Sequence, residues 1–92
     1  MEFEGKVAVI TGAGMGMGKA IAIAFAEEGA SIVVVDVNID TGQETVKTIQ
    51  NKGGRAIFIQ ADVSNASDAQ QIAVDTINSF ERIDVLVNNA GI

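Results

Sequence analysis

The stretch KVAVITGAGMGMGKAIAIAFAEEG, residues 6–29, decides the fold. It begins with a short apolar run that is rich in β-branched residues, which is typical of a buried strand. Four glycines follow between residues 12 and 18, and small and apolar residues then recur at helical spacing until Gly29, where a helix would end. The stretch therefore predicts a strand over 6–11, a glycine-rich turn and a helix over 18–28.

The same alternation of strand and helix patterns continues along the rest of the sequence. Apolar runs predict strands over 31–35, 55–60 and 84–87, and the first of these is apolar on both faces, as in a parallel sheet. Helical patterns separate these strands. The order β-α-β-α-β-α-β indicates an α/β fold, a Rossmann-like parallel sheet with right-handed crossovers and helices on both faces.

Two helix starts can be predicted from capping residues. The second helix is expected to begin at Thr41, because Glu44 lies three residues later in the pattern of a capping box. The third helix is expected to follow Asn65, a favourable N-cap residue. The apolar spacing of this third helix predicts a buried face that consists of Ala69, Ile72, Ala73, Thr76, Ile77 and Phe80.

Length and charge exclude several classes of protein. A chain of 92 residues is enough for one domain, and its formal net charge of −6 disfavours nucleic acid and anionic membrane surfaces, which attract clustered Lys and Arg. No apolar run approaches the roughly 20 residues of a membrane span, and the acidic N-terminus is not a signal peptide. A cytoplasmic location is therefore expected. Because the sequence has no Cys and no His, disulfides and the common zinc sites are excluded, and we expect no metal site.

The glycine-rich turn TGAGMGMG, residues 11–18, lies where a doubly wound sheet binds a pyrophosphate. Glycines let the backbone approach the phosphates, and the helix N-terminus adds unpaired N–H groups and the positive end of the helix dipole. The common G-x-G-x-x-G template does not fit, since it would need glycine in place of Met17. A Walker loop is excluded because no Gly-Lys-Ser/Thr follows at the required distance.

Two phosphate-binding patterns remain for this turn. One is G-x-G-x-G over residues 12–16, as in many methyltransferases that bind S-adenosylmethionine. The other is T-G-x-x-x-G-x-G over residues 11–18, which resembles the short-chain dehydrogenase/reductase family; that family usually has Ile where Met17 stands. The methyltransferase loops carry an acid two residues before the first glycine, where this chain has Ile10, so the dehydrogenase interpretation is the stronger of the two.

An acidic residue at the end of the second strand bears on the choice of cofactor. The Asp36 carboxylate can accept hydrogen bonds from both ribose hydroxyls of an adenosine. A 2′-phosphate beside it would be repelled, by about 1–4 kcal/mol for like charges a few Å apart near a surface. Sites for NADP normally add an Arg or Lys, but the turn offers Met15, and Asp36 is followed by Val37 and Asn38. The sequence therefore predicts NAD(H) rather than NADP(H).

Two further motifs carry the resemblance. Asp62 and Val63, after the third strand, resemble the pair that lies beside the adenine in this family, and NNAG, residues 88–91, resembles its signature at the end of the fourth strand. The resemblance implies that the backbone around Asn89 lies against the nicotinamide-side ribose, for which the next two residues leave room. The cofactor-binding residues predicted in this way are Gly12, Met15, Gly16, Met17, Gly18, Asp36, Asp62, Val63, Asn89, Ala90 and Gly91.

The resemblance covers nearly the whole chain and implies the strand order 3-2-1-4. It also implies an oxidoreductase that transfers hydride between NAD(H) and an alcohol or carbonyl substrate. The catalytic Ser, Tyr and Lys of the family follow the fourth strand, and this sequence contains no Tyr. Residues 1–92 are therefore expected to be a truncated NAD(P)-binding Rossmann domain that has no catalytic residues and is inactive alone.

The resemblance also leaves the fourth strand at an edge. An exposed strand over 84–87 predicts self-association, or a missing C-terminal half that would cover it. Two alternative functions remain open at this point. One is a non-catalytic module that binds a dinucleotide or associates with itself, and the weaker one is a methyltransferase fragment that binds S-adenosylmethionine.

Overall fold

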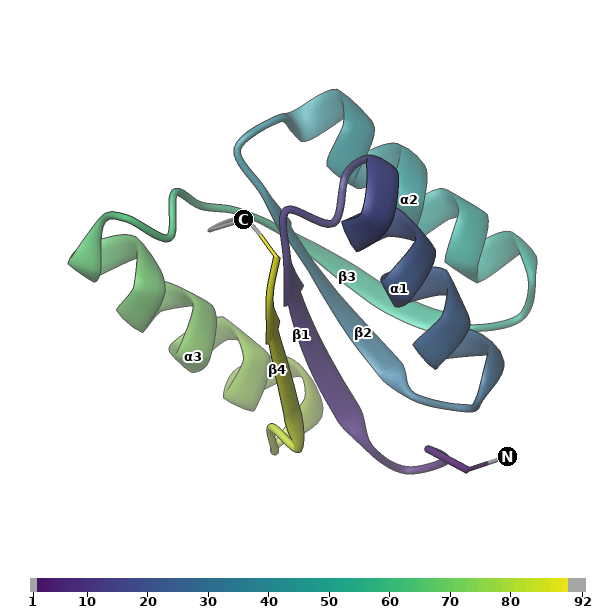
Figure 1. Cartoon of the computed structure of the whole chain (residues 1–92). Coiled ribbons are helices and arrows are strands. Elements are labelled where there is room, and N and C mark those ends of the chain that lie inside the picture. Colours follow the sequence, from purple (N-terminus) through teal and green to yellow (C-terminus); the bar gives the residue numbers. More distant parts are fainter. Residues whose placement is uncertain (1, 90–92) are drawn as a thin grey trace.

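The computed structural model describes residues 2–89, which form a four-stranded parallel sheet with helices on both faces (Figure 1). Helices α1 and α2 cover one face and helix α3 lies on the other. The strand order β3-β2-β1-β4 confirms the predicted fold class and topology. In chain order, the elements are β1 (Val7–Thr11), α1 (Gly16–Glu27), β2 (Ser31–Asp36), α2 (Ile39–Asn51), β3 (Arg55–Gln60), α3 (Ala66–Phe80) and β4 (Val85–Asn88).

Each face of the sheet has its own apolar core, because successive residues of a strand point to opposite faces. Ile10 of β1 belongs to the core that α1 and α2 cover. Val9 of the same strand and Val33 of β2 belong to the other core, where Ile72 of α3 packs. The two central strands are therefore buried on both faces, which explains why their sequences are apolar without alternation.

Helix α2 begins two residues earlier than the sequence predicted. Its N-cap is Asn38, whose side-chain oxygen accepts a hydrogen bond from the Thr41 N–H at 3.1 Å. Thr41 lies inside the helix, so the predicted capping box with Glu44 is wrong; Asn is a better N-cap residue than Thr. The Glu44 carboxylate instead forms an ion pair with Lys19 of α1 at 3.3 Å. The other predicted cap is confirmed, because Asn65 caps α3.

Helix α3 buries less of its apolar face than predicted. Ile72 and Thr76 are buried, and Phe80 is half-buried, but the other three residues of the predicted face are exposed. Two of these three residues, Ala69 and Ala73, instead line an open groove between α3 and the strands β1 and β4. The exposed members of the predicted face are Ala69, Ala73 and Ile77.

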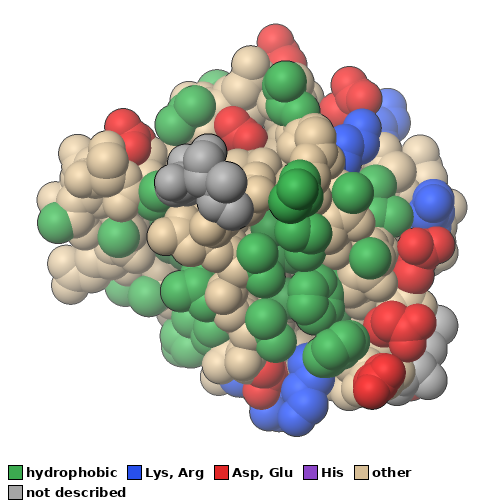
Figure 2. Space-filling model, viewed as in Figure 1, with side chains coloured by type: hydrophobic (Ala, Val, Ile, Leu, Met, Phe, Trp, Pro, Cys, Tyr) green, Lys and Arg blue, Asp and Glu red, His purple; other side chains and the backbone are tan. Residues whose placement is uncertain are grey.

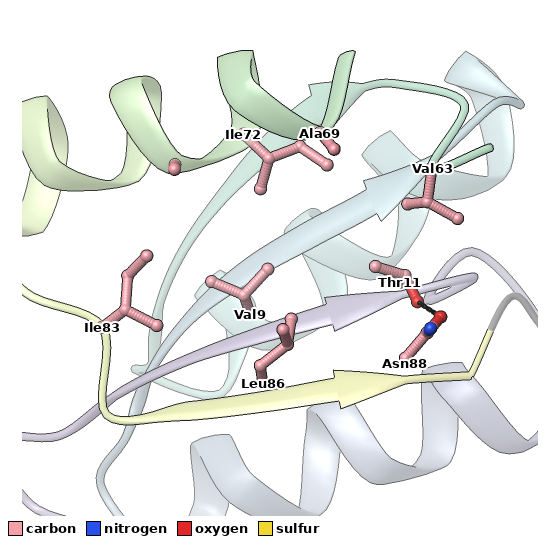
Figure 3. Close-up of a pocket in the computed structure, with 9 residues that line it drawn as sticks. Val9, Thr11, Val63, Ala69, Ile72, Ile83, Leu86 and Asn88 are labelled. Atoms are coloured by element: carbon pink, nitrogen blue, oxygen red, sulfur yellow. Dashed lines mark hydrogen bonds between the residues drawn. The ribbon is translucent and has the colours of Figure 1, made fainter. Parts of the chain in front are cut away.

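An apolar groove of about 260 Å³ runs between α3 and the strands β1 and β4. In Figure 3, Val9 and Leu86 project from the strands toward Ile72 and Ala69 of the helix. Leu86 remains 66% exposed. In the view of Figure 2, hydrophobic side chains gather over the middle of the surface, where β4 runs between α3 and α1.

Strand β4 pairs with β1 alone among the described residues, in the register Ala8↔Val85 to Thr11↔Asn88. It therefore forms one edge of the sheet, as predicted from the strand order. No helix within residues 2–89 is long and apolar enough to cross a membrane.

Candidate functional site

The carboxyl ends of the four strands meet at one edge of the sheet, and a cavity of about 430 Å³ opens there. From β1 the chain first builds the sheet outward on one side, through β2 and β3, and then returns to place β4 on the other side of β1. In open α/β sheets, ligands bind outside the strand ends at such a switch point. The lining comes from the ends of β2 and β4 and from the segments that follow β1, β2 and β3. It consists of Gly12, Val35, Asp36, Val37, Ala61, Asp62, Val63, Ser64 and Asn88.

The structure brings four of the predicted residues together in this cavity: Gly12, Asp36, Asp62 and Val63. The predicted Ala90 and Gly91 lie outside the described residues. Sequence reasoning missed five residues of the lining, four of which directly flank Asp36 or the Asp62–Val63 pair. The missed residues are Val35, Val37, Ala61, Ser64 and Asn88.

The remaining predicted residues of the glycine-rich turn lie beside the cavity, at the start of α1. Gly12 and Gly16 have φ values of 63° and 60°, a left-handed conformation that favours glycine. Helix α1 begins at Gly16, two residues before the predicted start, and no described side chain caps it. Its first N–H groups are therefore oriented for an anionic ligand. Met15 and Met17, on either side of Gly16, are 64% and 68% exposed.

Gly18 is buried against the opposite arm of the turn. A Cβ atom there would overlap the Gly12 carbonyl oxygen and lie 2.7 Å from Asn89 Nδ2. The Asn89 side chain donates a hydrogen bond to that carbonyl oxygen at 3.3 Å. Asn89 therefore supports the turn with its side chain by satisfying a backbone carbonyl directly after β1.

The neighbouring Asn88 connects the ends of β4 and β1. The Thr11 hydroxyl lies 3.1 Å from Asn88 Oδ1, to which it can donate a hydrogen bond (Figure 3). It also lies 3.4 Å from the Val87 carbonyl oxygen. Both asparagines of the NNAG sequence thus hold the β1 end of the cavity in place.

Two backbone N–H groups hold the Asp36 carboxylate at the end of β2. Gly14 N donates to Oδ2 at 2.8 Å, and Asn38 N donates to Oδ1 at 3.0 Å. One of these donors belongs to the glycine-rich turn and the other to the N-cap of α2. The carboxylate therefore has a defined position at the junction of the turn, the strand and the helix.

Asp62 forms the second acidic position of the cavity. The Ser64 hydroxyl donates to Asp62 Oδ1 at 2.6 Å and the Ser64 N–H donates to the same oxygen at 2.9 Å. These hydrogen bonds lower the pKa of Asp62 below its ordinary value of 3.8, so the group is ionised near neutral pH. The described residues of the lining include no Lys or Arg, which leaves the cavity with a negative rim.

The turn is also held from the side of α2. Thr45 is fully buried, and its hydroxyl lies 3.0 Å from the Ala13 carbonyl oxygen, 3.4 Å from that of Gly14 and 3.2 Å from that of Thr41 in its own helix. One hydroxyl can thus donate to the turn from the middle of the helix. Within residues 2–89, no group of three or more acidic side chains is arranged to hold a metal ion.

Comparison with known proteins places the chain among oxidoreductases. An uncharacterized oxidoreductase of Thermotoga maritima is 52% identical over 92 residues, which are 100% of this chain and 36% of that protein. The short-chain dehydrogenase/reductase homolog YusS of Bacillus subtilis is 44% identical over 91 residues, which cover 95% of this chain and 81% of that protein. The chain spans about a third of the length of most curated relatives that it matches.

A solved structure with bound cofactor shares the fold. The structure of 7α-hydroxysteroid dehydrogenase complexed with NADH and 7-oxo glycochenodeoxycholic acid matches with a TM-score of 0.93 and 42% identity, over 95% of this chain and 34% of that one. The family model described as short chain dehydrogenase matches residues 6–92. On this match, and on a fold shared at this level of identity, the chain belongs to the short-chain dehydrogenase family of oxidoreductases.

Proposed function

We propose that the chain binds NAD(H) in the cavity at the carboxyl edge of the sheet, as the cofactor-binding part of an oxidoreductase. The reaction would transfer hydride between NAD(H) and an alcohol or carbonyl substrate. The observation that carries the proposal is the Asp36 carboxylate, which the Gly14 N–H and Asn38 N–H hold beside the glycine-rich turn. The 430 Å³ cavity is within the usual range for small-molecule sites.

The described residues offer partners for the adenosine and pyrophosphate parts of such a cofactor. We assign the pyrophosphate to the turn over 12–18 and to the first N–H groups of α1, where Gly12 and Gly16 leave the backbone accessible. The adenine would lie beside Asp62 and Val63. The nicotinamide-side ribose would lie near Asn89, with the predicted contribution of residues 90–91. The nicotinamide supplies hydride chemistry, and the part of the chain described here binds and orients the cofactor.

The charge of the cavity supports NAD(H) over NADP(H). A 2′-phosphate would lie near Asp36, and no Lys or Arg of the described lining could neutralise it. Lys19, on the adjacent helix α1, is paired with Glu44. We expect NADP⁺ to bind at least about fivefold more weakly than NAD⁺, from a repulsion of roughly 1–4 kcal/mol.

Isothermal titration of the 92-residue chain tests both parts of the proposal. NAD⁺ should bind, and the D36A variant should lose most of the preference over NADP⁺. The D40A variant is the matched control, because it makes the same charge change at an exposed position in the first turn of α2. Binding of S-adenosylmethionine in place of NAD⁺, or equal affinity for the two dinucleotides, would contradict the proposal.

We also expect no dehydrogenase turnover from these 92 residues alone, since the sequence has no Tyr to act as the family's proton donor. Steady NADH production from a simple alcohol by the purified chain would contradict this expectation.

A second candidate function is self-association through β4. It rests on the outer edge of this strand, which has no partner strand within residues 2–89, and on Leu86, which is 66% exposed beside the apolar groove. Sedimentation velocity should show a dimer or larger species for the wild-type chain and a monomer for the L86K variant. A wild-type monomer at tens of micromolar would count against this candidate.

A further inference from the structure

Three glycines of the turn have different structural reasons to be glycine. Gly16 has a positive φ, and a Cβ atom on Gly18 would overlap a backbone carbonyl. Gly14 has neither constraint, because its φ is outside the positive range and the three atoms nearest to the position of a Cβ atom there all belong to side chains. An alanine at position 14 would therefore be compatible with the backbone of the turn.

The atoms nearest to Gly14 are side-chain atoms of the candidate cofactor site. A Cβ atom on Gly14 would lie 2.7 Å from Asp36 Oδ2, 3.1 Å from Asp36 Cγ and 2.5 Å from Thr41 Oγ1. Carbon and oxygen atoms without a hydrogen bond do not approach so closely, so both of these side chains would have to move. The carboxylate oxygen involved is the one that accepts the Gly14 N–H.

Thr41 restricts the space beside the Asp36 carboxylate. Its hydroxyl oxygen is buried and forms no hydrogen bond within the described part of the chain. The Thr41 N–H donates to the N-cap side chain of Asn38, which holds the backbone of Thr41 but leaves its hydroxyl able to turn about the Cα–Cβ bond. The Asp36 side chain can also move, because it ends at the open cavity. A methyl group at position 14 must displace both groups, so it displaces the carboxylate whatever Thr41 does.

From this geometry we infer that Gly14 is a positioning residue that sets the Asp36 carboxylate and thereby the selectivity for a dinucleotide without a 2′-phosphate. The inference rests on the proposed function. Gly14 acts in two ways: its N–H binds Oδ2, and its missing side chain leaves the space that Oδ2 occupies. A methyl group at position 14 removes this space while the N–H donor remains.

The expected effect of G14A is a change in selectivity with little change in fold. Displacing the carboxylate weakens its hydrogen bonds to the ribose of NAD⁺ and moves its charge away from the position of a 2′-phosphate. The ratio of the dissociation constants for NADP⁺ and NAD⁺ should fall about tenfold, the effect of losing one charge-assisted hydrogen bond. The melting temperature of the unliganded variant should stay within a few degrees of wild type.

A double-mutant cycle separates this positioning role from a general effect on the turn. The wild-type, G14A, D36A and G14A/D36A chains are titrated with NAD⁺ and NADP⁺, and their unfolding is followed by circular dichroism. In the D36A background there is no carboxylate to displace, so adding G14A should change the ratio by less than about twofold.

Three results would overturn the inference. A folded G14A variant with the wild-type ratio would show that the carboxylate does not depend on Gly14. An equal effect of G14A with and without Asp36 would assign the effect to the turn. A G14A variant that fails to fold would show that the side chains of Asp36 and Thr41 cannot move aside for the added methyl group. Failure of the wild-type chain to bind either dinucleotide is a different result, which refutes the proposed function and with it this inference.

Discussion

Replacing Thr45 with valine tests how strongly α2 holds the glycine-rich turn. The T45V change exchanges one hydroxyl for a methyl group of similar size, at a side chain that is fully buried. It removes the donor that lies 3.0 Å from the Ala13 carbonyl oxygen. Losing a buried hydrogen bond and leaving its acceptor without a donor costs roughly 1–3 kcal/mol. We expect T45V to lower the free energy of unfolding by about 2 kcal/mol, from a total of roughly 5–14 kcal/mol for a domain of this length.

The loss can be measured as a decrease of about 8–16 °C in the melting temperature, since 1 kcal/mol corresponds to roughly 4–8 °C in a domain of this size. Far-ultraviolet circular dichroism is the suitable signal, because the sequence contains no Trp and no Tyr. T48V is the matched control in the same helix. The Thr48 hydroxyl donates only within α2, to the Glu44 carbonyl oxygen at 3.0 Å, so T48V should cost less than about 0.5 kcal/mol. Equal losses for T45V and T48V would refute the reasoning.

Three other features allow predictions of stability. A Cβ atom on Gly42 would overlap the Phe58 ring. G42A should therefore lower the free energy of unfolding, measured in urea, by about 1–3 kcal/mol, although alanine has the higher helix propensity. A G42A variant that is more stable than wild type would contradict this packing. Removing the α3 cap with N65A should cost about 1 kcal/mol in the same assay, whereas N65S should retain most of the stability; equal losses would mean that the cap is unimportant. Hydrogen bonds from Arg82 and a backbone N–H lower the pKa of Asp84 in the folded protein below its ordinary value of 3.8. The ionised carboxylate therefore stabilises the fold above about pH 4, and this stabilisation is lost as the pH falls through the pKa of Asp84 in the folded protein. Between about pH 5 and about pH 2, the free energy of unfolding should therefore fall less for D84N than for wild type. The same fall for both proteins would argue against a stabilising role of the Asp84 carboxylate.

The sequence predicts the elements of the fold well because their signals are local. Strand β2 is apolar at every position from Ile32 to Val35, and only a strand that is covered on both faces is stable with that pattern. The Thr11–Gly18 turn identifies the strand end at which the cavity opens. Asp36 ends β2 and Asp62 follows β3, its neighbour in one parallel sheet, so their proximity in the cavity follows from the topology.

The remaining features depend on contacts between distant segments. The capping-box pattern at Thr41 is a genuine local signal, but Asn38 competes for the same helix start and forms the cap in the structure. The apolar spacing of α3 indicates which of its faces is apolar, yet it cannot show how far the sheet extends beneath residues such as Ile77. The close approach of Gly14 and Thr41 joins two segments that are far apart in the sequence, and no pattern in either segment predicts it.

The position of β1 between β2 and β4 also determines the order in which the protein can fold during synthesis. Strand β2 is available as a partner soon after β1, but the other partner, residues 85–88, is synthesised about 50 residues later. At ribosomal rates this delay is roughly 3–10 s, during which one edge of the central strand remains unpaired. Chaperones that bind extended apolar segments would have access to β1 throughout this interval. The cavity between Gly12 and Asn88 is complete only when β4 has paired, so a bound nucleotide can stabilise the finished sheet but cannot assist its earlier assembly.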